Sequence, residues 1–132
     1  MRCHYCQQPA ELVTGEAIYP HRPDLAAKKF WRCVPCAAYV GCHPGTDEPL
    51  GRLANAELRS AKMAAHAAFD PLWSGGRMKR SQAYGWLAKQ LGKPKKETHI
   101  GWFDLESCRR VVRICASDEA RSLRPDRVKG AR

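Results

Sequence analysis

Two pairs of cysteines near the amino terminus constrain the fold of this chain more than any other feature. Cys3 and Cys6 form one Cys-x2-Cys pair, and Cys33 and Cys36 form a second pair after 26 intervening residues. Each pair can present two thiolates to one metal ion, and two pairs complete a tetrahedral site. Zinc suits four soft thiolates because its d-electrons impose no geometry. The spacing therefore predicts a zinc ribbon, with these four cysteines as the ligands of one structural zinc ion.

Reduced, unligated thiols or two disulfides are the alternatives to zinc. The chain has seven cysteines, and an odd number fits a disulfide framework badly. The start, Met1-Arg2-Cys3, has no apolar run behind it, and no stretch approaches 18 apolar residues. We therefore expect neither a signal peptide nor a membrane span. In a reducing cytoplasm, paired cysteines favour metal over disulfides.

The other cysteines are less informative. Cys42 and His43 closely follow the second pair and could replace a ligand or join a second metal site, although a cysteine after a ribbon strand is more often a core residue. Cys108 and Cys115 lie seven residues apart in an expected helix, a separation of about 10 Å that is too long for one zinc ion. We expect these two to be apolar packing residues.

The region around the cysteine pairs reads as short strands. Residues 10–19 predict two strands with a turn near Gly15, and residues 30–32 lead into the second pair. Residues 37–41 leave that pair as another β segment. This strand–knuckle–strand order is the one that a zinc ribbon needs.

Three helices are expected after the ribbon, starting near Asn55, Ser81 and Asp104, each a suitable N-cap residue. The first should stop near Pro71, the second is closed by Gly92, and the third ends near residue 115.

Apolar residues recur at helical spacing in each expected helix. They are Leu58, Ala61, Ala65, Ala68 and Leu72, then Tyr84, Leu87, Ala88 and Leu91, then Leu105, Cys108, Val111, Val112 and Cys115. We therefore predict an α+β protein, in which an N-terminal four-cysteine ribbon of short antiparallel strands packs on a small three-helix unit. The expected division is a ribbon over 1–51, a helical part over 52–116 and a basic, flexible tail over 117–132.

Positive charge is concentrated in the helical part. The formal net charge is +10, yet residues 1–51 carry equal numbers of basic and acidic side chains, and four thiolates with one zinc ion would bring that region to about −2. Residues 71–96 carry seven basic side chains and no acidic ones: Arg77, Lys79, Arg80, Lys89, Lys93, Lys95 and Lys96. Clustered lysines and arginines predict binding to phosphates of DNA or RNA, whereas a solvated basic face that keeps the protein soluble is the simpler alternative.

Two other functions deserve comparison. A protein-interaction module that binds and modulates a host protein could use Trp73, Trp86 and Trp102 as anchors. A metal-dependent nuclease would need a cluster of carboxylates and histidines. Two loops rich in proline and glycine carry the candidates for such a cluster: His21, Asp24, His43, Asp47 and Glu48. Their spacing matches no recognised hydrolase motif, so we expect no enzyme activity.

A helix-turn-helix is a further possible arrangement of the last two expected helices. Their connection, from Gly92 to Phe103, is much longer than the three or four residues of such a turn. A basic loop between two helices can still bind phosphates without reading bases.

Several stretches, taken together, resemble a family of small phage and bacterial proteins described as zinc-finger-containing domains of unknown function. The likeness covers roughly residues 3–115 and implies that the four paired cysteines are ligands and that the chain has a phage or prophage origin. Together with the reducing cytoplasm expected from the cysteines, that origin predicts the cytoplasm of a bacterial host as its location. The likeness implies no activity. The stretches are Cys3-x2-Cys6, Ile18–Leu25, Phe30–His43, Pro49–Arg59, Ala65–Trp73 and His99–Asp104.

Overall fold

The computed structural model describes residues 1–75, 78–117 and 120. The chain forms two compact units, Met1–Arg59 and Ser60–Arg132. The division predicted from the sequence, after residue 51, lies eight residues nearer the amino terminus.

Part of the expected basic surface lies outside the described residues. This applies to Arg77 and, apart from Ser117 and Ala120, to the predicted tail over 117–132. Within the described part of the chain, no helix has the length and apolar character needed to cross a membrane.

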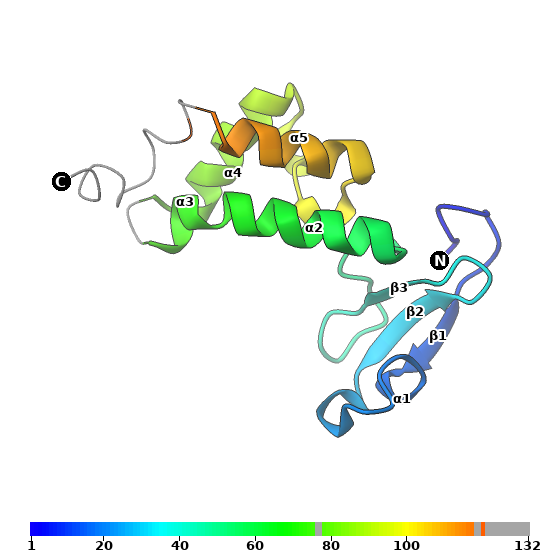
Figure 1. Ribbon diagram of the computed structural model, residues 1–132. Helices are drawn as coiled ribbons and strands as arrows, with labels where there is room; N and C mark the ends of the chain where they lie inside the picture. The colour runs from blue at the N-terminus through cyan, green and yellow to red at the C-terminus, as the bar shows by residue number, and fades with distance from the viewer. Residues whose placement is uncertain (76–77, 118–119, 121–132) are drawn as a thin grey trace. The chain divides into compact units, whose positions relative to one another are not determined.

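The first unit contains a three-stranded antiparallel sheet, whose strands are labelled in Figure 1. Strands β1 (Glu11–Thr14), β2 (Lys29–Cys33) and β3 (Ala38–Gly41) lie in that order, so β2 is central. In β2, Trp31 lies opposite Val40 of β3. The sheet confirms the α+β class and the predicted strands on either side of the second cysteine pair.

The predicted second strand after Gly15 is wrong. The chain instead forms a helical turn, α1 (Gly15–Ile18), and then a 3-10 turn, η1 (Pro23–Leu25), before it returns to the sheet. Gly15 is buried where the chain closes on itself: its N–H donates to the carbonyl of Lys28 at 2.8 Å. A Cβ at Gly15 would lie 1.8 Å from the carbonyl oxygen of Leu25. The backbone of Leu25 therefore approaches Gly15 closely, and the chain turns here. Strand propensity describes local preference only, so it does not predict this contact.

Three aromatic rings from α1's C-terminal end, β2 and β3 pack edge to face in this unit. Tyr19, Phe30 and Tyr39 have ring centroids 5.7–6.3 Å apart. The hydroxyls of Tyr19 and Tyr39 form a hydrogen bond of 2.8 Å. Burial, together with that hydrogen bond, raises the pKa of Tyr19. The rings therefore fix the returning chain against the sheet.

Helices and helical turns make up most of the second unit as far as Cys115, and Figure 1 labels the α-helices. The first of them begins in the first unit and continues into the second. In chain order they are α2 (Ala56–Phe69), α3 (Pro71–Ser74), α4 (Arg80–Leu91), the 3-10 turns η2 (Lys95–Glu97) and η3 (Ile100–Trp102), and α5 (Leu105–Cys115).

Two of the three predicted helix caps are confirmed. The Asn55 side chain accepts a hydrogen bond from the N–H of Leu58 at 3.0 Å, and the Asp104 side chain accepts one from Ser107 at 2.9 Å. Gly92 ends α4 in the left-handed conformation, with φ of 70°. Each device satisfies backbone groups that the helix leaves unpaired.

Ser81 is not the cap of α4, which begins one residue earlier. Lys79 occupies the N-cap position, and its N–H donates to the side chain of Gln82 at 2.9 Å. This is the backward half of a capping box, in which a residue in the first turn satisfies the cap's own N–H. The prediction relied on the preference of serine for N-cap positions, and it therefore placed the start of α4 at a residue that lies inside the helix.

Of the fourteen residues in the predicted apolar stripes, ten are buried, Ala61, Ala68 and Leu105 are half-buried, and one is exposed. Phe69, Leu87 and Val111 are fully buried, and Phe69 packs on Tyr84 with ring centroids 4.6 Å apart. Val112, assigned to the stripe of α5, is 37% exposed, because it lies one position beyond the buried face. The two cysteines of this helix are fully buried, which confirms that they are packing residues: Cys108 and Cys115.

Two glycines provide a matched test of the close approach in the first unit. We expect Gly15→Ala to destabilise the zinc-loaded protein by about 1–3 kcal/mol, because the new methyl group meets backbone that cannot move away freely. Gly85→Ala is the control: Gly85 lies inside α4 with no atom within 4 Å of a built Cβ. That change should stabilise by about 0.5–1 kcal/mol. Urea unfolding of each variant measures both effects, and an unaffected Gly15→Ala protein would contradict the account of the turn.

Candidate metal centre

The two cysteine pairs occupy similar tight turns. In the first, the N–H of Gln7 donates to the carbonyl of Cys3 at 2.9 Å; in the second, the N–H of Ala37 donates to the carbonyl of Val34 at 3.0 Å. Gln7 and Ala37 each directly follow the second cysteine of a pair, and both have positive φ, 66° and 51°. Non-glycine residues adopt this conformation rarely. The two turns thus share a left-handed residue directly after the second cysteine, although their hydrogen bonds span four residues in the first and three in the second.

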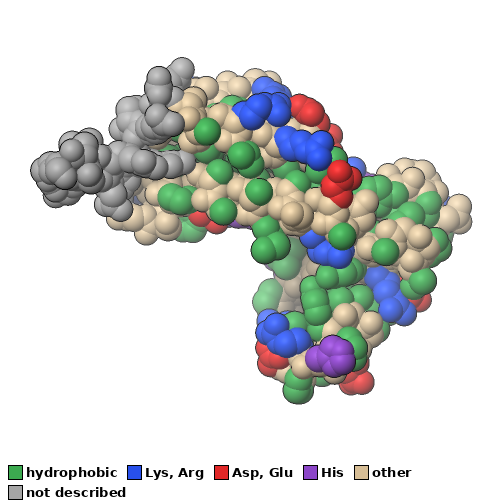
Figure 2. Space-filling model, viewed as in Figure 1, with side chains coloured by type: hydrophobic (Ala, Val, Ile, Leu, Met, Phe, Trp, Pro, Cys, Tyr) green, Lys and Arg blue, Asp and Glu red, His purple; other side chains and the backbone are tan. Residues whose placement is uncertain are grey.

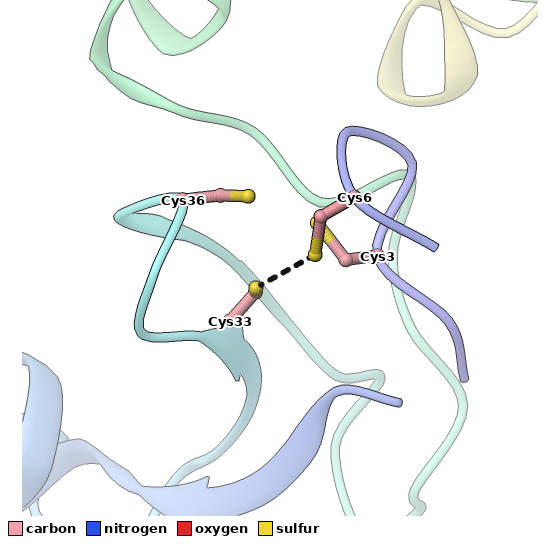
Figure 3. Close-up of side chains that lie close together, drawn as sticks. All are labelled: Cys3, Cys6, Cys33 and Cys36. Atoms are coloured by element: carbon pink, nitrogen blue, oxygen red, sulfur yellow. Dashed lines mark hydrogen bonds between the residues drawn. The ribbon is translucent and has the colours of Figure 1, made fainter. Parts of the chain in front are cut away.

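The four sulfurs converge on one point. The Sγ atoms of Cys3, Cys6, Cys33 and Cys36 all lie within 4.8 Å of one another, and those of Cys6 and Cys33 are 3.6 Å apart (Figure 3). A tetrahedral zinc ion with Zn–S bonds of about 2.3 Å would place its sulfurs about 3.8 Å apart. The arrangement therefore fits one zinc ion held by four thiolates.

The surroundings of the sulfurs are apolar. Cys3 and Cys33 are buried, and they form a core cluster with Ala38 and Leu53. Trp31 is among the partly buried residues that pack against this cluster. An ion enclosed by four protein ligands and an apolar shell has no open position for a water molecule or substrate. The donor set is that of a structural site.

The pKa values of two thiols of this group, Cys3 and Cys36, shift in opposite directions. Burial opposes ionisation of Cys3, but N–H groups of Cys6 and Tyr5 and the neighbouring thiols outweigh it and lower the pKa of Cys3 to about 7. Burial and the surrounding thiols, including the charge on Cys3, raise the pKa of Cys36 to about 12. One thiolate forms readily, and its negative charge opposes the next. A divalent cation removes this conflict, because zinc binds all four as thiolates.

Cys42 lies outside this centre. It is half-buried, beside exposed His43, and burial raises the pKa of its thiol. Among the residues that the structure describes, the four paired cysteines are the only group of three or more potential metal ligands that converge. The described residues therefore offer no second metal site around Cys42 and His43.

Two of the three loop carboxylates considered for a nuclease form ion pairs. Asp24 accepts two hydrogen bonds from Arg22, which hold the pKa of that carboxyl below its usual range. Asp47 pairs with Lys29 at 2.8 Å. These ion pairs account for two of the acidic groups on the loops.

The described basic residues of 71–96 form two groups, one at each end of α4. Lys79 and Arg80 lie at its start, while Lys89, Lys93, Lys95 and Lys96 lie in its last turn and just beyond it. Lys93 is half-buried: its ammonium lies 4.9 Å from the centre of the Phe103 ring. The other five side chains are exposed.

Sequence reasoning missed one arrangement beside the metal centre. Arg59, from the first turns of α2, lies over the ring of Tyr39 on β3, with the guanidinium carbon 4.1 Å from the ring centre. A β-bridge between Tyr39 and Ala54 brings the two segments together. No spacing rule connects residues that meet through an isolated bridge, so the sequence contains no signal for this contact.

The comparison with protein families agrees with this centre. A family model described as a zinc-finger-containing domain matches residues 1–118. The chain belongs to this family. Its four-cysteine group is positioned to bind one structural zinc ion, as predicted. No curated protein and no solved structure was found to match this zinc-finger protein.

Removal of one ligand should abolish metal binding. We expect Cys33→Ser to lose its zinc and to unfold the first unit, because small zinc modules gain on the order of 10–16 kcal/mol from the metal. Cys42→Ser is the matched control, since it removes a nearby thiol outside the converging group. Zinc per chain, measured after extensive dialysis, should be one for the control and zero for Cys33→Ser. A variant that loses no metal and keeps its circular dichroism would rule out this ligand set.

Proposed function

We propose that this zinc-finger protein binds nucleic acid through phosphate contacts made by the basic residues around α4. One observation carries the proposal: five of these side chains are exposed, and none pairs with a carboxylate among the described residues. Unpaired cations on one segment attract a polyanion and release its counterions on binding. The five are Lys79, Arg80, Lys89, Lys95 and Lys96.

The length of α4 suits a phosphate backbone. Its two basic groups lie at opposite ends of the helix, whose 12 residues span about 18 Å. That length covers about five base pairs of a duplex at a rise of 3.4 Å. Contacts at both ends of α4 would therefore meet different phosphates and fix the protein along the nucleic acid.

Aromatic rings and a hydrogen-bonded turn hold basic residues of both groups in place. The guanidinium of Arg80 lies 4.8 Å from the ring centre of Tyr84 and 5.7 Å from that of Trp73. Lys95 and Lys96 lie in η2, a hydrogen-bonded turn, where the sequence predicted an irregular loop. Ammonium groups act as point charges and do not read base edges, so we expect little sequence preference.

Acidic side chains limit the extent of this surface. In the view of Figure 2, basic side chains of the helical part lie beside acidic ones. Arg113 on α5, for example, pairs with Glu106 at 3.1 Å. The proposed contact surface is accordingly restricted to the segment around α4.

In this proposal zinc stabilises the first unit and performs no chemistry, so the protein acts as a binding module without enzyme activity. The setting that we propose is the cytoplasm of a bacterium carrying a phage or prophage. A reducing compartment keeps the four thiols available for metal.

Salt dependence of binding tests the proposal. Fluorescence anisotropy with a labelled DNA duplex and a labelled single-stranded RNA, each over a range of salt concentrations, gives affinity and slope. We expect the combined Lys89→Gln, Lys95→Gln and Lys96→Gln variant to reduce the slope of log K against log salt by about 3, since each lost phosphate contact removes about 0.9.

The control variant removes the same charge elsewhere. Arg22→Gln, Lys28→Gln and Arg113→Gln change exposed residues far from α4 in the sequence, two of them in surface ion pairs that contribute little to stability. It should bind like the unmodified protein. Equal slopes for the two triple variants would show that net charge, and not this segment, drives binding.

A further inference from the structure

The first unit has an open pocket beside the second cysteine pair. Its volume is 310 Å³, which lies at the lower end of the range of about 300–1,000 Å³ for ligand pockets. All of its lining residues belong to the first unit, from α1, β2, the turn after β2, β3 and the start of α2. It shares no residue with the basic segment around α4, so its role is independent of the proposed nucleic-acid binding.

Aliphatic side chains form much of the pocket lining. Ile18, Val34 and Ala37 contribute apolar surface. Val34, which lies between the two cysteines of the second pair, is 62% exposed. A large apolar side chain that is open to solvent at a concave site is typical of a binding surface.

The polar part of the pocket carries one uncompensated cation. Arg32 is already paired with Glu11, at 2.5 Å. The Nη1 of Arg59 donates to the carbonyl of Ala54 at 2.7 Å, and no carboxylate among the described residues pairs with this guanidinium. Fixed by Ala54 and by the ring of Tyr39, Arg59 presents its remaining N–H groups in a defined orientation.

The aromatic ring in this pocket is poorly suited to a nucleobase. Arg59 covers one face of Tyr39, and Tyr19 and Phe30 pack against the same ring edge to face. Proteins that hold single bases stack them on open aromatic faces. A saturated side chain needs only the aliphatic surface that the pocket provides.

We propose that this pocket binds a short segment of a partner protein that carries an aliphatic side chain next to a carboxylate. The aliphatic group lies against Ile18, Val34 and Ala37, and the carboxylate accepts hydrogen bonds from Arg59. Charge complementarity with Arg59 and the aliphatic lining select this class of ligand over a basic or a purely polar peptide.

The test uses the zinc-loaded full chain, labelled with ¹⁵N, and the blocked peptide acetyl-Ser-Leu-Glu-Ser-amide. We expect saturable shifts of the amide signals of Ile18, Val34 and Ala37. Binding should weaken about tenfold or more when the peptide carries Gln in place of Glu, because the charged hydrogen bonds are lost. A peptide with Ser in place of Leu should also bind more weakly.

Two variants separate the parts of the site. Arg59→Gln should remove the discrimination between the Glu and Gln peptides. Val34→Glu, at an exposed position, should abolish binding without changing zinc content. Met63→Glu is the matched control: it adds the same charge at a side chain that is 72% exposed and outside the pocket, and it should bind the peptide normally.

Other outcomes would overturn the inference. It fails if no peptide shifts these signals at millimolar concentration, or if Val34→Glu and Met63→Glu bind equally well. It also fails if a short RNA oligonucleotide, and not the peptide, shifts the same amides.

Discussion

Convergence of four thiols is the condition on which the first unit of this protein depends. Its sheet has three short strands, and the segment between β1 and β2 contains only brief helical turns. Such a small unit buries too little apolar surface to be stable without an added constraint. A metal ion supplies that constraint by joining two turns that are far apart in the sequence, and it also resolves the mutual repulsion of ionised thiols in an apolar environment.

Features governed by local rules could be predicted from the sequence. The cysteine spacing identified all four members of the group that converges, and the caps at Asn55 and Asp104 follow from side chains that satisfy nearby N–H groups. The helical turn after Gly15 could not be predicted, since it arises from the approach of Leu25, ten residues away. The pocket formed by Tyr39 and Arg59 depends likewise on a contact between distant segments.

Two kinds of basic residue occur in this chain, and burial and partners distinguish them better than charge counts. Lys93 and Arg80 lie over aromatic rings, so their replacement would also disturb packing. Lys89, Lys95 and Lys96 are exposed and can be changed with little effect on the fold. A charge cluster that looks uniform in the sequence thus contains both structural and freely available cations.

The similar turns around the two cysteine pairs have a consequence for the lifetime of the protein. Each turn holds a non-glycine residue, Gln7 or Ala37, in a conformation that an unconstrained chain would leave. Without the ion, relaxation at either residue would move one pair of sulfurs away from the other and release the segment between them. Proteases cut released segments of this kind. The abundance of the protein would therefore follow the supply of zinc, even at a constant rate of synthesis.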